Sequence, residues 1–175
     1  MRSTGALVGA CSEIKVNSSC PVNAGAGSSI MNLEGRIATD ADAAQLATMN
    51  QQLIRDEGHR NSMSTAELEN RMRNWFVNKY QASIFMVDGS TAGYALYKHE
   101  QDWTYLRQLF ILPELRRRGF GRAAMHWLVQ NPWRNARRIR LDVLVGNADG
   151  ISFWRSVGFQ DYCITMEMDR SPNDD

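Results

Sequence analysis

The sequence lacks three features that mark common functional classes. Its 20 basic and 19 acidic residues give a net charge of only +1, so the chain has no overall positive field of the kind that dedicated nucleic-acid-binding proteins carry. Its three cysteines are an odd, sparse set, which argues against a disulfide framework and favours a reducing compartment, so we expect a cytoplasmic location. No apolar run approaches the roughly 18 residues of a membrane span, so we expect no membrane partner.

The length of 175 residues suits one compact domain and is too short for two of ordinary size. Residues 1–30 are rich in Ser, Gly and Ala without any periodicity, so we expect a flexible leader that is either disordered or not native to the working protein. Residues 31–170 are predicted to form the single domain, and residues 171–175 a short tail.

Hydrophobic periodicity in the patterned part predicts strands and helices in the order β-α-α-β-β-β-α-β-α-β. Local signals support it, namely an expected cap at Asp40, a capping box from Ser64 to Glu67 and a hairpin turn at Asp88-Gly89. Hairpin strands followed by β-α-β units predict an α/β fold, with a mixed, mostly antiparallel central sheet flanked by helices. The expected strands cover residues 33–39, 82–87, 91–99, 103–112, 137–145 and 159–168, and the helices 40–58, 64–76, 119–130 and 148–157.

The stretch "RRRGFGR" at residues 116–122 places four arginines and two glycines where a strand gives way to a helix. A helix N-terminus has unpaired backbone N–H groups and a partial positive charge, which together suit a phosphate group. Gly119 and Gly121 have no Cβ atom to keep a ligand from the backbone. We therefore predict a polyphosphate cradle, with a merely solvated charged loop as the alternative.

The residues of this turn can be compared with the known phosphate-binding motifs. A P-loop requires Gly-Lys followed by Ser or Thr, but Arg122 and Ala123 follow Gly121. The dinucleotide fingerprint is matched by Gly119, Gly121 and Ala124, with Asp142 downstream, yet "PELRRR" separates the first glycine from its strand. A dinucleotide-dependent oxidoreductase and an RNA-binding protein remain as minor alternatives.

The stretch "LFILPELRRRGFGRAAMHWL" resembles motif A of the GCN5-related N-acetyltransferase (GNAT) superfamily, through Arg116, Gly119 and Gly121. Downstream, "LDVLVGNADGISFWRSVGF" resembles a later motif of the same family. The resemblance covers residues 34–168 and implies an enzyme that transfers an acetyl group from acetyl-CoA directly to an amine.

The resemblance also implies which residues bind coenzyme A. The main chain of three strand residues would pair with the pantetheine arm, the Arg-Gly turn would bind the pyrophosphate, and Arg116 would hold the first position of the motif. Asn147 occupies a cofactor-contacting position of the later motif, although a helix cap is an equally physical role for it. The expected cofactor-binding residues are Leu109, Phe110, Ile111, Arg116, Arg117, Arg118, Gly119, Phe120, Gly121, Arg122, Asn147 and Trp154.

The catalytic groups implied by the resemblance are incomplete in this sequence. Asp142 falls where some relatives have a carboxylate that takes the amine proton, although it could instead pair with a neighbouring arginine. Trp154 replaces the tyrosine that protonates the departing thiolate in many relatives, so it is interpreted as a packing or cofactor-stacking residue. Water would then supply the proton, and no metal site is expected.

The resemblance implies that the acceptor lies against a wall formed by the first two helices, their loop and the hairpin. The fourth strand is similar to that of polyamine acetyltransferases, but Arg107 and Gln108 replace their paired acids, which makes a polycation a poor candidate. We expect a small amine or amino-acid-like acceptor, because a weakly basic amine loses its proton more easily. The expected acceptor-contacting residues are Glu57, His59, Tyr94, Tyr97, Trp103 and Arg107.

Two other functions stay open from the sequence. A protein N-terminus or lysine could accept the acetyl group, so the expected partner is a small-molecule or peptide amine. A non-catalytic acetyl-CoA sensor would bind the cofactor without turnover. No nucleic-acid partner is expected, and the sequence is compatible with a monomer or a homodimer.

Overall fold

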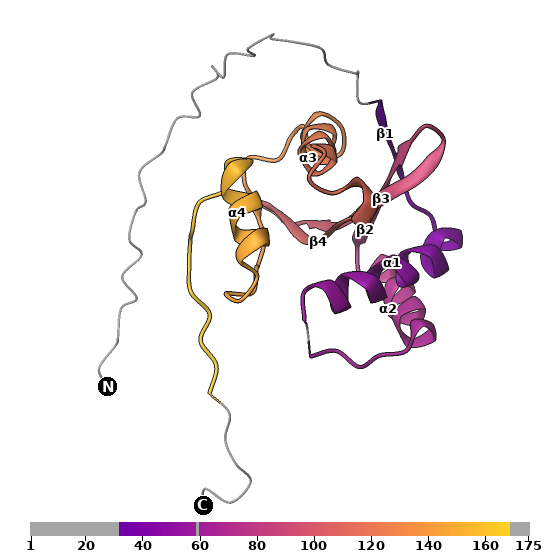
Figure 1. Cartoon of the computed structure of the whole chain (residues 1–175), viewed down its shortest axis with the longest axis horizontal. Coiled ribbons are helices and arrows are strands. Elements are labelled where there is room, and N and C mark those ends of the chain that lie inside the picture. Colours follow the sequence, from indigo (N-terminus) through magenta and orange to yellow (C-terminus); the bar gives the residue numbers. More distant parts are fainter. Residues whose placement is uncertain (1–31, 59, 169–175) are drawn as a thin grey trace, which may run out of the picture.

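The computed structural model describes residues 32–58 and 60–168 (Figure 1). The expected leader 1–30, the tail 171–175 and His59 lie outside these described residues. The strands are β1 (Leu33–Ile37), β2 (Tyr80–Val87), β3 (Ser90–His99), β4 (Thr104–Ile111) and β5 (Ile139–Arg140). The helices are α1 (Ala43–Asp56), α2 (Thr65–Val77), α3 (Phe120–Gln130) and α4 (Ala148–Ser156), with short 3-10 turns η1 (Asp40–Asp42) and η2 (Pro113–Leu115).

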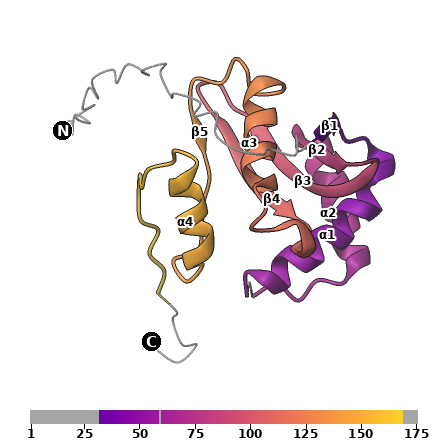
Figure 2. The ribbon, with the colours of Figure 1, turned by 45° about the horizontal axis from the view of Figure 1, so that its top comes forward.

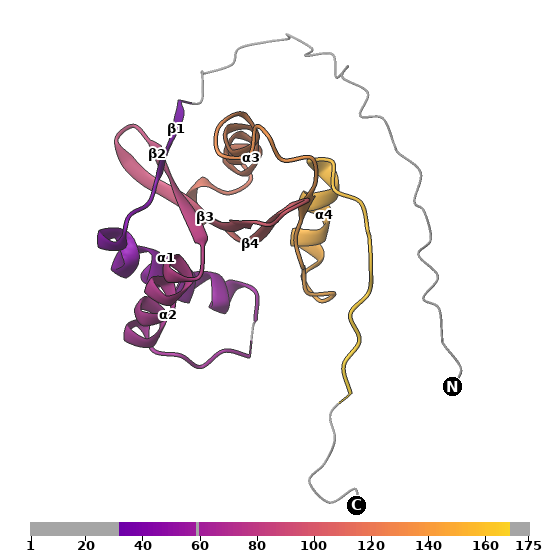
Figure 3. The ribbon, with the colours of Figure 1, turned by 180° about the vertical axis from the view of Figure 1, so that it is seen from behind.

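The strands form one sheet in the order β1-β2-β3-β4-β5, antiparallel throughout except for the parallel pair of β4 and β5. The helices α1 and α2 lie on one face of the sheet and α3 on the other, while α4 lies beyond β4 (Figures 2 and 3). Two cores result, one under α1 that includes Leu46 and one under α3 that includes Leu128. The predicted α/β class with a mixed, mostly antiparallel sheet flanked by helices is confirmed.

Local signals account for several boundaries of these elements. Ser64 and Glu67 form the predicted capping box, in which the Ser64 backbone N–H donates to the Glu67 carboxylate over 2.7 Å. Asp88 and Gly89 both have positive φ, 49° and 76°, and they form the predicted two-residue turn between β2 and β3.

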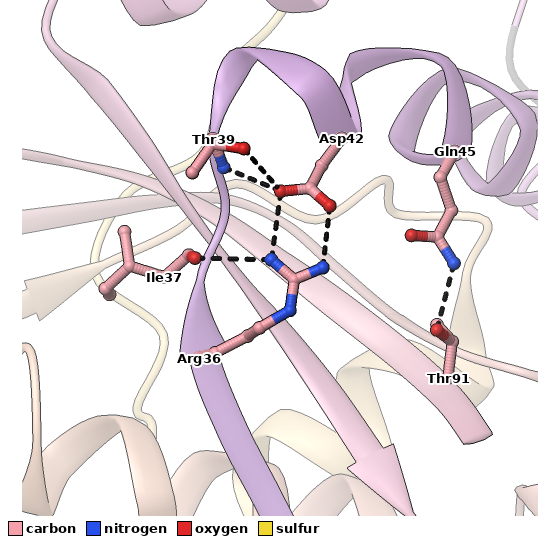
Figure 4. A network of polar contacts seen from close by, with 6 residues as sticks. All are labelled: Arg36, Ile37, Thr39, Asp42, Gln45 and Thr91. Carbon is pink, nitrogen blue, oxygen red and sulfur yellow. Dashed lines mark hydrogen bonds and ion pairs between the residues drawn. The ribbon is translucent and has the colours of Figure 1, made fainter. Parts of the chain in front are cut away.

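The start of α1 differs from its prediction. In place of an Asp40 cap, Thr39 precedes η1, and its backbone N–H donates to the Asp42 carboxylate over 2.7 Å (Figure 4). Arg36 on β1 donates two hydrogen bonds to the same carboxylate, over 2.9 and 2.6 Å. These bonds, from Arg36 first, hold the pKa of Asp42 well below its usual range. A further hydrogen bond, from the Gln45 side chain to the Thr91 hydroxyl over 2.9 Å, connects α1 to β3.

Two predicted strands are shortened or absent. The strand expected over residues 137–145 is reduced to Ile139–Arg140, and residues 159–168 form no strand although their apolar side chains alternate. Tyr162, Ile164 and Met166 are therefore 79%, 84% and 89% exposed. Alternation determines which side chains share a face, but a strand also requires a hydrogen-bonded neighbour, and no strand lies beside residues 159–168 in the described chain.

Candidate active site

The strands β4 and β5 are paired over only two residue pairs. Thr104 pairs with Ile139 and Tyr105 with Arg140, after which the chain leaves β5. The opposite edge of β4 is paired with β3 along its whole length. From residue 106 to 111, β4 therefore has no neighbouring strand on its β5 side among the described residues, and this open edge includes the expected cofactor-binding main chain of residues 109–111.

A β-bulge interrupts the same strand. Leu96 pairs with Gln108 and Tyr97 with Leu106, so Arg107 is an extra residue in β4. The side chain of Arg107 is exposed on the α2 side, where its guanidinium lies 4.9 Å from the ring centroid of Trp75. The bulge thus brings the expected acceptor residue Arg107 close to α2.

The turn between β4 and α3 exposes a row of backbone donors. Arg117 and Gly119 have positive φ, 57° and 86°, and Gly119 is the N-cap of α3 without a side-chain cap. The backbone N–H groups of residues 117–122 donate to no acceptor among the described residues. A left-handed turn that leads into a helix N-terminus directs such donors and the positive end of the helix dipole at one point. The predicted cradle therefore fits a pyrophosphate.

The four arginines of the turn have different environments. Arg117 and Arg118 are exposed beside the backbone donors. Arg116 instead turns back, where its Nε donates to the Ile111 carbonyl over 2.8 Å and its guanidinium pairs with Asp56 at the end of α1. Arg122 donates to the Ser156 carbonyl over 3.1 Å. Arg116 and Arg122 thus connect the turn to α1 and α4.

The structure requires a glycine at position 121 for a different reason than the one predicted. A Cβ atom at this position would lie 3.0 Å from the Phe153 ring, so the side chain of α4 occupies the space that we expected a ligand to use. Gly121 therefore permits close packing between α3 and α4, while its backbone N–H stays in the cradle.

The two expected cofactor contacts near α4 have structural roles in this arrangement. The Asn147 Oδ1 accepts from the Gly150 N–H over 2.8 Å and caps α4, as the alternative interpretation predicted. Trp154 packs edge-on against Phe153 and Phe159, with ring centroids 4.9 and 5.4 Å away. This packing agrees with the predicted packing role of Trp154.

Asp142 lies beside a tyrosine that sequence reasoning missed. The Tyr105 hydroxyl donates to the Asp142 carboxylate over 2.7 Å, at the point where β4 and β5 separate. Burial first, and then the neighbouring carboxylate, raise the pKa of Tyr105 to about 12. Asp142 is exposed, and the ion pairs of the described residues do not include it, so the predicted alternative of an arginine partner is not observed.

The expected acceptor residues are not all brought together. Tyr94 and Tyr97 are fully buried in the two cores, where their hydroxyls are bonded to Gln108 and Ser83, so direct contact with an acceptor is wrong for both in this structure. Trp103 is partly buried under the Arg140 guanidinium, at 4.3 Å. Glu57 is exposed at the end of α1, and His59 lies outside the described residues.

The described part of the chain has neither a cluster of metal-binding side chains nor a helix suited to a membrane. No group of three or more His, Cys, Asp or Glu residues there is arranged to hold a metal ion. None of the described helices combines the length and the apolar character that crossing a membrane requires.

Comparison with known proteins agrees with this geometry. The model of the acetyltransferase (GNAT) family matches residues 47–159. An uncharacterized N-acetyltransferase of Bacillus pumilus (strain SAFR-032) is 34% identical over 91 residues, which are 52% of each chain, so the match spans about half of that relative.

Solved structures share the fold at low identity. A possible acetyltransferase from Clostridium difficile 630 is similar with a TM-score of 0.65 and 17% identity, over 79% of this chain and 97% of that one. An aminoglycoside N-acetyltransferase in complex with coenzyme A has a TM-score of 0.63 and 14% identity, over 85% of this chain and 98% of that one.

Proposed function

Because the chain belongs to the acetyltransferase (GNAT) family, we propose that it is an acetyl-CoA-dependent N-acetyltransferase whose acceptor is a small primary amine. The observation that carries this proposal is the row of unpartnered backbone N–H groups at residues 117–122, next to the open edge of β4. When bound, acetyl-CoA supplies an acetyl group as a thioester, which forms an amide with the acceptor nitrogen as the thiol leaves.

In this proposal the cradle holds the pyrophosphate. The backbone N–H groups of residues 117–122 donate to its oxygens, and the exposed Arg117 and Arg118 add positive charge. Main-chain groups of successive strand residues point to opposite edges, and the Leu112 N–H donates to the Ala92 carbonyl next to β3. The N–H groups of Leu109 and Ile111 therefore point to the open edge of β4, where they would stabilise negative charge on a carbonyl oxygen. Arg116 keeps this segment in place through the Ile111 carbonyl.

Asp142 is the proposed general base that accepts the proton of the amine. Its exposed carboxylate is held by the Tyr105 hydroxyl, which therefore acts as a positioning residue. Trp154 has no acidic proton to give to the leaving thiolate. A thiol with a pKa of about 8.5 leaves without strong acid assistance at neutral pH. Positioning and polarisation then provide most of the acceleration.

The charge of the acceptor side argues against polycationic acceptors. The aminoglycoside acetyltransferase shares the fold with this chain, but aminoglycosides carry several ammonium groups. Here Arg71 and Arg107 both lie within 5 Å of the Trp75 ring, at 4.7 and 4.9 Å from its centroid. Two guanidinium groups would repel such an acceptor.

Calorimetry with two ligands tests the cradle. Acetyl-CoA contains the pyrophosphate, whereas S-acetylpantetheine has the same thioester arm without it. We expect the purified protein to bind acetyl-CoA at least about 100-fold more tightly, because several charge-assisted hydrogen bonds are lost with the pyrophosphate. Thiol release with a panel of amines then tests turnover. Equal affinity for the two ligands, or the absence of turnover with every amine, would contradict the proposal.

A further inference from the structure

Two arginines from different elements gather around one tryptophan on the α2 side of the sheet. Arg71 and Trp75 lie one turn apart on α2, and Arg107 is the bulged residue of β4. The two guanidinium carbons lie 4.7 and 4.9 Å from the Trp75 ring centroid. Burial and then the charge of Arg107 lower the pKa of Arg71, so the two like charges are close enough to act on each other.

The positive charge of this pair is not balanced by an ion pair. The ion pairs formed within residues 32–58 and 60–168 include neither Arg71 nor Arg107. Two guanidinium groups around one ring repel each other, and partial burial of Arg71 increases the cost in free energy. An anion bound close to both would offset it.

A donor at this place also lacks an acceptor. Arg71 donates to the Oδ1 of the fully buried Asn50 over 2.7 Å, but its own Nε–H is buried without a partner. The Nδ2 of Asn50 faces the Tyr94 hydroxyl. A buried donor without an acceptor, such as the Nε–H of Arg71, is uncommon in folded proteins. Arg71 is thus a partly buried cation without an anionic partner among the described residues.

Arg107 lies in the same strand as the proposed positioning residue Tyr105. The charge of Arg107 acts on Tyr105, two residues earlier in β4, where it opposes the rise in the pKa of Tyr105 caused by burial and by Asp142. Tyr105 in turn is bonded to Asp142. A small molecule could therefore place its amine near Asp142 and an anionic group near the arginines.

We propose that the amine acceptor also carries a carboxylate, and that Arg71 and Arg107 bind this carboxylate. The proposal rests on the proposed acetyltransferase function and names the substrate class of the same site. The exposed guanidinium of Arg107 over the Trp75 face keeps its N–H edge available, and that edge matches the two oxygens of a planar carboxylate. The Arg71 guanidinium, which Asn50 holds in place, adds positive charge next to it. Trp75 thus orients the donors and limits their motion.

A matched series of acceptors tests the proposal. Straight-chain ω-amino acids of increasing length are compared with their carboxamides and with the corresponding aminoalkyl phosphates, by kcat/KM for thiol release. The amine is similar throughout, and only the distal group changes. For the best chain length we expect the carboxylate to be preferred over the carboxamide by about 10- to 100-fold, the value of hydrogen bonds to a charged group. A preference for the phosphate over the carboxylate would overturn the assignment.

Variants connect the preference to the two arginines. In Arg107→Gln and in Arg71→Gln we expect the carboxylate-to-carboxamide ratio to fall at least about fivefold, through KM. The control Arg134→Gln removes an exposed arginine just after α3, and we expect it to keep the ratio. Acetyl-CoA affinity, measured by calorimetry, should stay unchanged in Arg107→Gln, because this side chain is exposed and outside the cradle. An unchanged ratio in both arginine variants contradicts the inference.

The outcomes separate this inference from the proposed function. Turnover of carboxylates and carboxamides at equal rates overturns the inference and leaves the acetyltransferase function standing. If acetyl-CoA binds but no acceptor of the series turns over, calorimetry with the N-acetylated products provides the readout. Equal binding of the acetylated acids and the acetylated amides then overturns the inference. If acetyl-CoA does not bind, the proposed function fails, and the inference fails with it.

Discussion

The hydroxyl of Tyr105 lies 2.7 Å from the carboxylate of Asp142, across the last residue pair that joins β4 to β5. The phenol comes from a strand that is paired on both sides at this point, so its position is fixed by the sheet. The carboxylate comes from the chain that has just left the sheet. The hydrogen bond therefore positions an exposed acidic group beside the open edge of β4.

Replacing Asp142 by Asn should slow acetyl transfer. The amide keeps the shape of the side chain and can still accept from Tyr105, but it cannot take a proton from the amine. The loss of a general base typically costs about 100- to 10,000-fold, so we expect kcat/KM to fall within this range at neutral pH. Steady-state thiol release measures it, with acetyl-CoA affinity as the control for folding. Unchanged rates across the pH range would remove Asp142 from the mechanism.

Replacing Tyr105 by Phe should have a smaller effect of the same kind. The phenol positions the base without exchanging protons, because its raised pKa, about 12, keeps it protonated throughout the working pH range. We expect a loss of about threefold to tenfold in kcat/KM, since one hydrogen bond of about 1 kcal/mol disappears. The alkaline limb of the pH–rate profile should be the same in both proteins. A limb that vanishes in Tyr105→Phe would mean that Tyr105 itself titrates in the reaction.

Replacing Gly119 by Val should weaken acetyl-CoA binding. Gly119 adopts φ = 86°, and a side chain in this left-handed region costs roughly 1–2 kcal/mol, more when it is β-branched. We expect the turn to adjust, the backbone donors to lose their common direction, and the Kd for acetyl-CoA to rise at least about tenfold in calorimetry. Gly146→Ala is the control, because a Cβ there meets no atom within 4 Å and the φ is ordinary. Wild-type affinity in Gly119→Val would argue against the cradle.

Replacing Asp42 by Asn should destabilise the protein near neutral pH and not in acid. The pKa of Asp42 is lowered in the folded state, mainly by the hydrogen bond from Arg36, so the carboxylate contributes stability above its unfolded pKa of about 4. That contribution is lost as the pH falls below this value toward the folded pKa. We expect a decrease of about 1–2 kcal/mol in the free energy of unfolding at pH 7, measured with urea.

The control for this prediction is Asp102→Asn, an exposed substitution in the loop between β3 and β4. It should change the free energy of unfolding by less than about 0.5 kcal/mol at any pH. A pH-independent loss in Asp42→Asn would mean that side-chain shape, and not the charge, stabilises the start of α1.

Local chemistry made part of this molecule predictable. The Ser64–Glu67 capping box and the Asp88-Gly89 turn depend on a few adjacent residues, and the structure contains both. The Arg-Gly turn was also recognisable, because strand, glycine and helix follow one another directly in the sequence. In each case the interacting groups are only a few residues apart.

The remaining features depend on how distant segments meet. The contact between Tyr105 and Asp142 follows from the register of β4 against β5, and the approach of Arg71 to Arg107 follows from a bulge in β4. Neither has a signal in the sequence. Tyr94 and Tyr97 were expected at the acceptor because the family resemblance implies that the hairpin faces the acetyl group. However, β3 is a central strand covered on both faces, so both side chains are buried in the two cores.

The short pairing of β4 with β5 has a mechanical consequence. The four strands from β1 to β4 are joined along most of their length, whereas only two residue pairs attach β5, and the segment that leads to α4, to the sheet. Opening a pairing of only two residue pairs costs less free energy than unfolding the whole domain. In native-state hydrogen exchange, amides of β5 and α4 should therefore lose their protection first, while those of β2 and β3 exchange only when the whole domain melts.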